Sequence, residues 1–188
     1  MTIVIGYKTD KGVILGADSL ASGGWNSTHR QDEKVFTKNG IGYGFTSSYR
    51  MGQILQYHSE SVTFEEGITP HEYAVKLLVP MWREILKTHG YTTISNNNEE
   101  GGQFLVAVRG ELFSVACDFQ VGDSKEPYSA VGCGTNYALG GLRILEKDKG
   151  INEEAKVERA LDVAKHFSNG CGGSNSIIFI GKDKPHNN

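Results

Sequence analysis

The start of the chain restricts the fold most, because two apolar stretches follow each other there almost without interruption. They cover residues 2–8 and 12–18 of the sequence TIVIGYKTDKGVILGAD. The polar turn between them, Thr9-Asp10-Lys11-Gly12, ends in glycine and predicts a β-hairpin. Chain ends usually fray, whereas here Met1 and Thr2 lead directly into a stretch typical of a buried strand. Either the strand simply begins early, or the end of the chain is itself a working part.

Further strands and helices are predicted in alternating blocks. Lys38-Asn39-Gly40 separates two short apolar stretches, and Asn-Gly is a strong hairpin signal. Thr69-Pro70 combines a capping residue with proline in a first helical turn, and Pro80 is expected to kink the helix that begins there. The expected strands are 33–38, 41–46, a hairpin over 103–119, 128–134 and 176–182; the expected helices are 48–60, one from residue 69, 135–147 and 152–167; residues 94–102 are expected to form a loop.

The order of these blocks is strands, two helices, strands, two helices and a final strand. This order favours an α+β fold in which two sheets pack on each other and helices cover both outer sides. We therefore expect a four-layer αββα sandwich of mainly antiparallel sheets. A length of 188 residues suits one domain, which we place over residues 1–188.

Composition and charge exclude several classes of protein. A hydrophobic content of 38% and a charged content of 22% are ordinary for a folded domain. The net charge of −3 gives no basic surface for nucleic acid, and no apolar run is long enough to span a membrane. The six histidines lack metal-ligand spacing. Three cysteines cannot all pair within the chain, and no signal peptide is evident, so we expect a cytoplasmic protein.

Thr2 is the first candidate for chemistry. A threonine hydroxyl is a poor nucleophile unless a base lies beside it. An N-terminal threonine carries its own base, because an α-amine titrates near pH 7.7–8.0 in model peptides. Removal of Met1 would expose that amine. The alternative is that Thr2 is only the first residue of a strand.

Asp18 and Lys34 lie at strand ends that an antiparallel arrangement can bring back beside Thr2. A buried lysine paired with an aspartate stays protonated, and its charge lowers the proton affinity of a neighbouring hydroxyl and amine. The charge of Lys34 is thus expected to act on the nucleophile rather than on bulk packing. The alternative is a purely structural Asp–Lys pair at a strand edge.

The stretch TIVIGYKTDKGVILGADSLASGG resembles the N-terminal segment of proteasome β-subunits and of their bacterial relative HslV, which are N-terminal nucleophile hydrolases. The match runs without a gap through Thr2, Asp18 and Lys34, which fall on that family's nucleophilic threonine, acidic residue and lysine. In IGYGFTSS, Gly44 falls on the glycine whose N–H helps to form the oxyanion hole. The resemblance returns in VGCGTNYALGG and weakly in SNGCGGSNSIIFIG, whereas residues 61–110 contribute little.

Three positions that would support the nucleophile depart from the family pattern. The serine of the family's Gly-Ser-Gly stretch is Cys133. In the pattern Asp-x-x-Ser-Gly-Gly, Ser168 replaces the aspartate and Cys171 replaces the serine. A thiol is a weaker hydrogen-bond donor than a hydroxyl, so the amine and water are expected to be held less firmly. HslV-type members also lack this last pattern, so the changes do not by themselves argue for inactivity.

The resemblance also implies where a substrate binds. In the family, the residue two positions before the oxyanion glycine forms the base of the primary specificity pocket; here it is Gly42, which predicts a deep pocket. Asp32 falls on another pocket-lining position, where its carboxylate would suit a basic side chain, or else it points to solvent. The expected substrate-binding residues are Ala21, Ser22, Asp32, Gly42 and Thr46.

The resemblance implies a threonine peptidase. Mature Thr2 would attack a peptide carbonyl while its α-amine takes the proton, and the acyl-enzyme would then be hydrolysed. Asp18 would hold Lys34, and the Gly44 N–H would stabilise the oxyanion. No cofactor and no metal are implied. The expected partners are a peptide or unfolded-protein substrate, further copies in a homo-oligomeric ring, and an ATP-driven unfoldase.

Two alternatives of different classes stay open. The first is a catalytically weak or inactive ring subunit that keeps the fold, an alternative with which the cysteine and serine replacements are compatible. The second is an amidase with the same N-terminal nucleophile that acts on a small molecule. Fluorogenic peptides with a Thr2→Ala control would separate the three.

Overall fold

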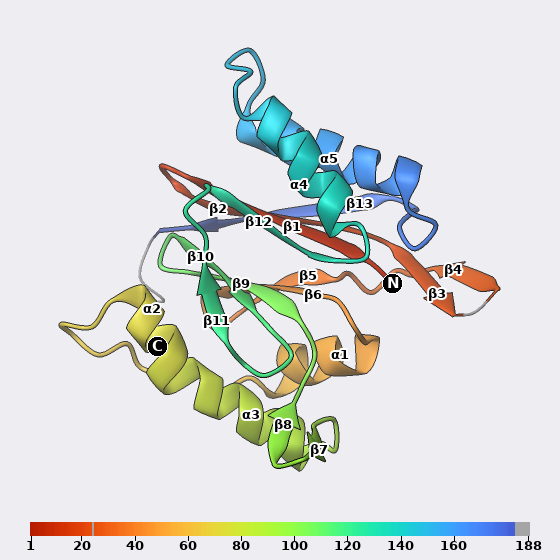
Figure 1. Cartoon of the computed structure of the whole chain (residues 1–188). Helices are drawn as coiled ribbons and strands as arrows, with labels where there is room; N and C mark the ends of the chain where they lie inside the picture. The colour runs from red at the N-terminus through yellow and green to blue at the C-terminus, as the bar shows by residue number, and fades with distance from the viewer. Residues whose placement is uncertain (24, 183–188) are drawn as a thin grey trace.

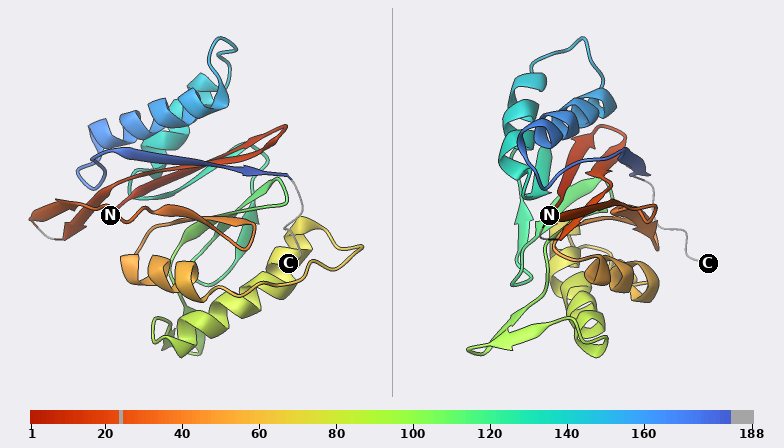
Figure 2. Two further views of the ribbon diagram at one scale, coloured as in Figure 1. Left: turned by 180° about the vertical axis from the view of Figure 1, so that it is seen from behind. Right: turned by 90° about the vertical axis from the view of Figure 1, so that its right-hand side faces the viewer.

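The computed structural model describes residues 1–23 and 25–182, and these residues form four layers (Figure 1). Helices form the two outer layers, and two β-sheets lie face to face between them. The same stacking is visible from behind and from the side (Figure 2). The predicted αββα sandwich of mainly antiparallel sheets is therefore confirmed.

The first sheet contains the N-terminal hairpin. Its strand order is β12-β1-β2-β13, and all neighbouring strands are antiparallel. The final strand of the chain thus pairs with the second, which closes the sheet around the hairpin. Its strands are β1 (Ile3–Thr9), β2 (Gly12–Asp18), β12 (Tyr128–Gly132) and β13 (Asn175–Gly181).

The second sheet has the order β11-β10-β9-β6-β5. The predicted Asn-Gly turn joins β5 to β6, and Asn39 and Gly40 have φ angles of 52° and 73°. Asparagine and glycine tolerate this left-handed backbone best, which explains the strength of the sequence signal. Its strands are β5 (Val35–Lys38), β6 (Ile41–Phe45), β9 (Phe104–Val108), β10 (Glu111–Val115) and β11 (Val121–Asp123).

Two groups of helices cover the outer faces of the sheets. The first sheet packs against α4 (Thr135–Leu145) and α5 (Glu153–Phe167), as Figure 1 shows. The second sheet lies against α1 and α3, and α2 and η1 precede α3 directly in the chain. These elements are α1 (Tyr49–His58), α2 (Pro70–Tyr73), η1 (Ala74–Leu78) and α3 (Val79–Thr88).

The helix predicted from Thr69 begins with a capping box. The Thr69 hydroxyl accepts a hydrogen bond from the Glu72 N–H, while the Glu72 carboxylate accepts one from the Thr69 N–H. The expected disturbance at Pro80 takes the form of the π-helical segment η1, which ends just before it. Proline has no N–H to donate, so the change of winding lies where the regular hydrogen-bond pattern is interrupted.

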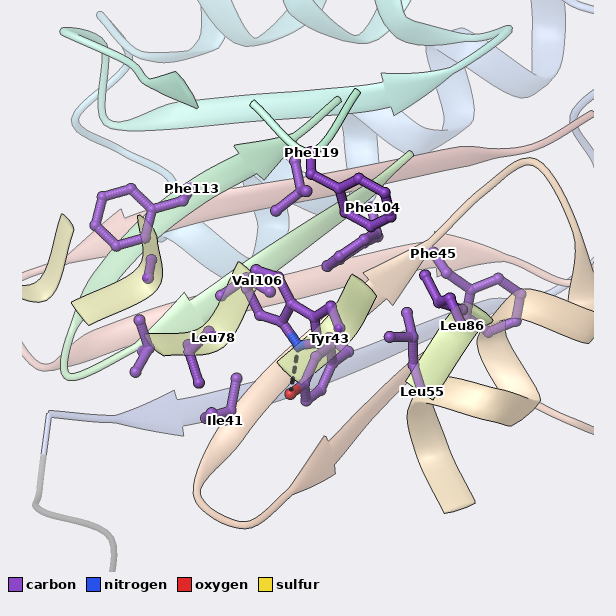
Figure 3. Close-up of a cluster of buried hydrophobic side chains, with 14 of the residues drawn as sticks. Ile41, Tyr43, Phe45, Leu55, Leu78, Leu86, Phe104, Val106, Phe113 and Phe119 are labelled. Atoms are coloured by element: carbon purple, nitrogen blue, oxygen red, sulfur yellow. Dashed lines mark hydrogen bonds between the residues drawn. The ribbon is translucent and has the colours of Figure 1, made fainter. Parts of the chain in front are cut away.

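Three apolar layers fill the spaces between the four structural layers. Ile3 and Ile5 on β1 pack toward α4 and α5, whereas Val4 points the other way, between the two sheets. Consecutive residues from Ile3 to Tyr7 are therefore all buried, which explains the unbroken apolar start of β1. Figure 3 shows the third layer, beneath the second sheet, where the Trp82 Nε1–H donates a 3.3 Å hydrogen bond to Tyr43 Oη.

Glycines allow the two sheets to approach closely. A Cβ atom at Gly6 would lie 2.5 Å from Leu112 of the other sheet. A Cβ atom at Gly42 would lie 2.5 Å from Ile180, and one at Gly44 would lie 2.5 Å from Val4. A larger residue at any of these positions would overlap the facing sheet, so the three glycines set the distance between the sheets.

Two small hairpins lie outside the main sheets. One comprises β3 (Leu20–Gly23) and β4 (Asn26–His29), which directly follow β2. The other comprises β7 (Thr93–Ser95) and β8 (Asn98–Glu100), so the expectation of a plain loop over residues 94–102 is wrong. Asn96 and Asn97 both have positive φ angles, which is the backbone of a two-residue hairpin turn. None of the helices within residues 1–23 and 25–182 is long and apolar enough to cross a membrane.

Candidate active site

Thr2 directly precedes β1, and the N-terminal end of the chain lies between the two sheets (Figure 1, Figure 2). Only 5% of its surface is exposed, and its hydroxyl donates a 2.6 Å hydrogen bond to the Met1 carbonyl oxygen. Its own carbonyl accepts a 3.4 Å bond from the Gly134 N–H. A Cβ atom at Gly132 would overlap this carbonyl, and Gly132 has a φ of 111° that suits glycine. The turn between β12 and α4 therefore holds the backbone of Thr2 in place by a hydrogen bond and by close packing.

Asp18 and Lys34 form a buried ion pair beside Thr2. The Lys34 Nζ lies 2.7 Å from Asp18 Oδ1, and the side chains are 1% and 0% exposed. Asp18 Oδ1 also accepts a 3.0 Å bond from the N–H of Ile3, the residue that follows Thr2. Its other oxygen, Oδ2, accepts a 2.9 Å bond from the Gly172 N–H. One carboxylate thus joins the ammonium group to the backbone next to the candidate nucleophile.

Lys34 is held by two acceptors. Besides Asp18, its Nζ donates a 2.7 Å bond to the Leu20 carbonyl oxygen. Burial lowers the pKa of Lys34 from its ordinary value, and the charge and hydrogen bond of Asp18 partly oppose that change. The pair connects the first sheet, which carries Asp18, to the second sheet, because Lys34 directly precedes its edge strand β5.

Cys133 and Cys171 also meet beside Thr2. Cys133 Sγ lies 3.5 Å from the Thr2 carbonyl oxygen, 3.5 Å from Ser168 Oγ and 3.7 Å from Cys171 Sγ. Both cysteines are free thiols; Cys133 is exposed, whereas Cys171 is buried. The structure therefore brings all three of the expected supporting residues together.

The pKa values of the two thiols are shifted in opposite directions. Burial alone would raise the pKa of Cys133, but its contacts with Ser168, the Thr2 backbone and Cys171 together bring the pKa below its ordinary value. Burial raises the pKa of Cys171 to about 12, and the nearby Asp18 carboxylate acts in the same direction. Cys133 is thus the thiol that ionises first.

The proposed oxyanion role of Gly44 is not supported by the sheet geometry. Gly44 lies within β6, between Val35 on β5 and Leu105 on β9. The Phe45 N–H bonds to Lys34 on the β5 side and the Thr46 N–H bonds to Gln103 on the β9 side. Since N–H groups alternate in direction along an antiparallel strand, the Gly44 N–H faces β9 and belongs to the ladder.

Gly42 also lies away from any pocket beside Thr2. It pairs with Thr37 and Ala107, and a Cβ atom there would contact the Ile180 side chain between the sheets. The expectation that Gly42 forms the base of a specificity pocket is therefore wrong. Because Gly42 has no side chain, the two sheets can approach each other closely at this position.

Ser47 offers a backbone donor that the sequence did not single out. It lies between the end of β6 and Ser48, the N-cap of α1, and has a φ of 67°. Its Oγ accepts a bond from the Gln103 N–H, but its own N–H has no partner among the residues that the structure describes. A free N–H at the start of a helix suits negative charge. The available signal was the Ser-Ser pair before a helical pattern.

The remaining substrate-side residues lie on neighbouring segments. Ala21 and Ser22 belong to β3, and the Ser22 hydroxyl is buried without a hydrogen-bond partner in the described part of the chain. Thr46 is buried, and its Oγ1 would lie 3.3 Å from a Cβ atom at Gly132, close to Thr2. Asp32 accepts two hydrogen bonds of 2.6 Å from Arg30, whose guanidinium lies 4.1 Å from the centre of the Tyr49 ring.

The four layers and their strand order define the class of fold as that of the proteasome-like N-terminal nucleophile hydrolases. BPH from Thiobacillus denitrificans, solved in complex with epoxomicin, has a TM-score of 0.79 and 20% identity over 97% of this chain and 100% of that chain. A second BPH structure gives a TM-score of 0.76 at 20% identity, over 96% of this chain and 100% of that one.

A third solved structure is eukaryotic HslV from Trypanosoma brucei. Its TM-score is 0.68 at 14% identity, over 95% of this chain and 99% of that chain. No protein-family model and no curated protein matches the sequence. At these identities the comparisons establish the fold, and the chemistry must be argued from the residues of this chain.

Proposed function

We propose that this chain is a threonine peptidase of the proteasome-like class, with Thr2 as its nucleophile. The contact that carries the proposal is made by Asp18, whose Oδ1 accepts both the Ile3 N–H and the Lys34 ammonium group. A structural ion pair has no need to bind the backbone beside an N-terminal threonine. Through Asp18 this arrangement holds a buried positive charge close to the backbone beside Thr2. In the proposed mechanism that charge lowers the proton affinities of the Thr2 hydroxyl and of the α-amine that removal of Met1 creates.

The first step is the removal of Met1. In the structure the Thr2 nitrogen is part of the Met1–Thr2 peptide bond, and the Thr2 hydroxyl is bonded to the Met1 carbonyl. Removal of Met1 frees the hydroxyl and creates an α-amine at the same time. The amine then takes the hydroxyl proton, directly or through a water molecule, as Thr2 Oγ1 attacks the substrate carbonyl.

The second step needs a donor for the developing oxyanion. We assign this role to the N–H of Ser47 in place of Gly44, because the Ser47 N–H is free and lies at the N-terminus of α1. An ester on Thr2 results, and water hydrolyses it. The backbone of β3 at Ala21 and Ser22 is a candidate contact for the backbone of the substrate.

The assembly that we propose is the one implied by the resemblance to proteasome-like proteins. We propose a homo-oligomeric ring that encloses the sites, in the cytoplasm, with an ATP-driven unfoldase as partner. Trp25 at the tip of the β3–β4 hairpin is fully exposed and is a candidate subunit contact. The proposed unit is a single domain over residues 1–188.

Turnover of fluorogenic peptides by the purified chain tests the proposal. We expect hydrolysis that epoxomicin inhibits, because BPH, which has the same fold, was solved with that compound. Small-molecule amides form the second substrate panel. Hydrolysis of these amides alone would favour the amidase alternative, and turnover of neither panel would favour an inactive ring subunit.

Processing of the N-terminus gives an independent prediction. The mass of the intact active protein, made in cells with normal methionine removal, should lack Met1. The reason is that an acylated nitrogen cannot accept a proton, so the chain that keeps Met1 has no base at Thr2. Protein that retains Met1 completely and is still fully active would contradict the mechanism.

Substrate preference gives a prediction for Asp32 and Arg30. Asp32 is bound in a two-point contact by Arg30, which lowers the pKa of Asp32, so its charge is already matched. Asp32→Ala should therefore release a positive charge and shift a positional peptide library toward acidic residues before the cleaved bond. Arg30→Ala should shift it toward basic residues. Unchanged preferences in both variants would place the pair outside the substrate site.

A further inference from the structure

The two cysteines beside Thr2 lie in two different turns, and the sulfur atom of each cysteine packs against the other turn. Cys133 lies in the turn between β12 and α4, and Cys171 lies in the turn between α5 and β13. A Cβ atom at Gly134 would lie 2.8 Å from Cys171 Sγ, and one at Gly170 would lie 2.5 Å from Cys133 Sγ. Each sulfur atom thus packs on a glycine of the other turn.

The geometry allows the two sulfur atoms to bond. They lie 3.7 Å apart, whereas a disulfide needs about 2.05 Å, so they must approach by about 1.7 Å. Glycines flank each cysteine on both sides, which gives both turns backbone freedom for this movement. Cys117, by contrast, lies in the turn after β10, in the second sheet.

The charges around the pair assign different roles to the two thiols. Cys133 is exposed and Cys171 is buried, and both lie within electrostatic reach of the Lys34 ammonium group, which favours a thiolate. The exposed thiol ionises more readily than the buried one. Cys133 is therefore the attacking residue and Cys171 the resolving residue.

We propose that Cys133 and Cys171 form a reversible dithiol–disulfide pair that low-molecular-weight disulfides such as oxidised glutathione oxidise. The Cys133 thiolate attacks one sulfur of the small disulfide and releases one thiolate, which leaves a mixed disulfide on Cys133. Cys171 then loses its proton and attacks the Cys133 sulfur, which releases the second small thiolate. Two protein thiols are oxidised, and one small disulfide is reduced to two thiols.

Oxidation changes a contact of the candidate nucleophile. In the reduced state the Cys133 S–H points to the Thr2 carbonyl oxygen at 3.5 Å. A disulfide sulfur has no proton to donate, so among the residues that the structure describes the carbonyl keeps only the 3.4 Å bond from the Gly134 N–H. We therefore expect the oxidised protein to turn over peptide about three- to tenfold more slowly, an effect that rests on the proposed function.

Mass spectrometry of the folded protein in glutathione buffers of graded redox potential tests the pair without reference to activity. The wild-type chain should lose the mass of two hydrogen atoms and yield a Cys133–Cys171 cross-linked peptide. Cys171→Ser should instead retain one glutathione on Cys133. Cys117→Ser is the matched control and should behave as the wild type does. No disulfide in the wild type, or one that includes Cys117, would overturn the proposal.

Peptide turnover by the same samples tests the effect on the site. We expect the rate to fall as the disulfide forms and to recover with dithiothreitol. An unchanged rate in fully oxidised protein would overturn the regulatory part of the proposal. If neither state hydrolyses peptide, the peptidase proposal fails, while the mass result still decides whether the redox pair exists.

Discussion

Thr2→Ala should reduce peptide turnover by on the order of 10⁴-fold or more and leave the protein folded. The hydroxyl is the group that forms the acyl-enzyme, and no other group at the site can replace it in the proposed mechanism. Its only side-chain hydrogen bond in the described chain is to the Met1 carbonyl, which is lost on processing in any case. The structural cost of the substitution is therefore small.

Thr2→Ser provides the matched control for this experiment. It keeps a hydroxyl at the same position and loses only a methyl group, so we expect reduced but measurable turnover. The rates are measured with fluorogenic peptides, and circular dichroism and elution volume report the fold and the assembly. Equal turnover by the wild type and by Thr2→Ala would show that the activity belongs to another residue or to a contaminant.

Lys34→Met should lower both activity and stability. Loss of the positive charge beside Thr2 should reduce turnover by on the order of 10²-fold, since a charge at close range shifts a pKa by roughly 1–3 units. The same substitution leaves the buried Asp18 carboxylate unpaired, which typically costs about 3–5 kcal/mol of unfolding free energy. The Tm should fall by roughly 6–20 °C in thermal unfolding.

A double variant separates the two effects. Asp18→Asn combined with Lys34→Met removes both charges, so much of the lost stability should return while turnover stays low. Asp18→Asn alone should be less severe for turnover, because Lys34 is still present. Wild-type rates in both single variants would mean that the pair is structural and that the proposed mechanism fails at its centre.

The sequence predicted the main elements wherever local chemistry determines them. The Asn39-Gly40 turn and the Thr69 capping box were visible because each depends on neighbouring residues. The β7–β8 hairpin was missed because its exposed strands carry no apolar pattern, although Asn96 and Asn97 supply the turn. A turn signal alone, without buried apolar residues on either side of it, does not predict strands.

The candidate site was predictable in part for the same reason. Asp18 and Lys34 were identified, and the structure joins them across the two sheets. Gly44 was misassigned because the direction of an N–H group depends on strand register, which a sequence does not display. The Cys133–Cys171 contact depends on two turns that are distant in the chain, so only the fold reveals it.

The glycines between the sheets influence the site from a distance. Gly42 and Gly44 act as spacers that fix the thickness of the sandwich, and the Asp18–Lys34 bond is a strut across it. A side chain at either glycine would push the two sheets apart and lengthen the Asp18–Lys34 bond at the edge of the sandwich. This would happen although neither glycine touches Thr2 in the described structure. Substitutions at Gly42 and Gly44 are therefore restricted by the need to keep Asp18 and Lys34 in contact at the edge of the sandwich.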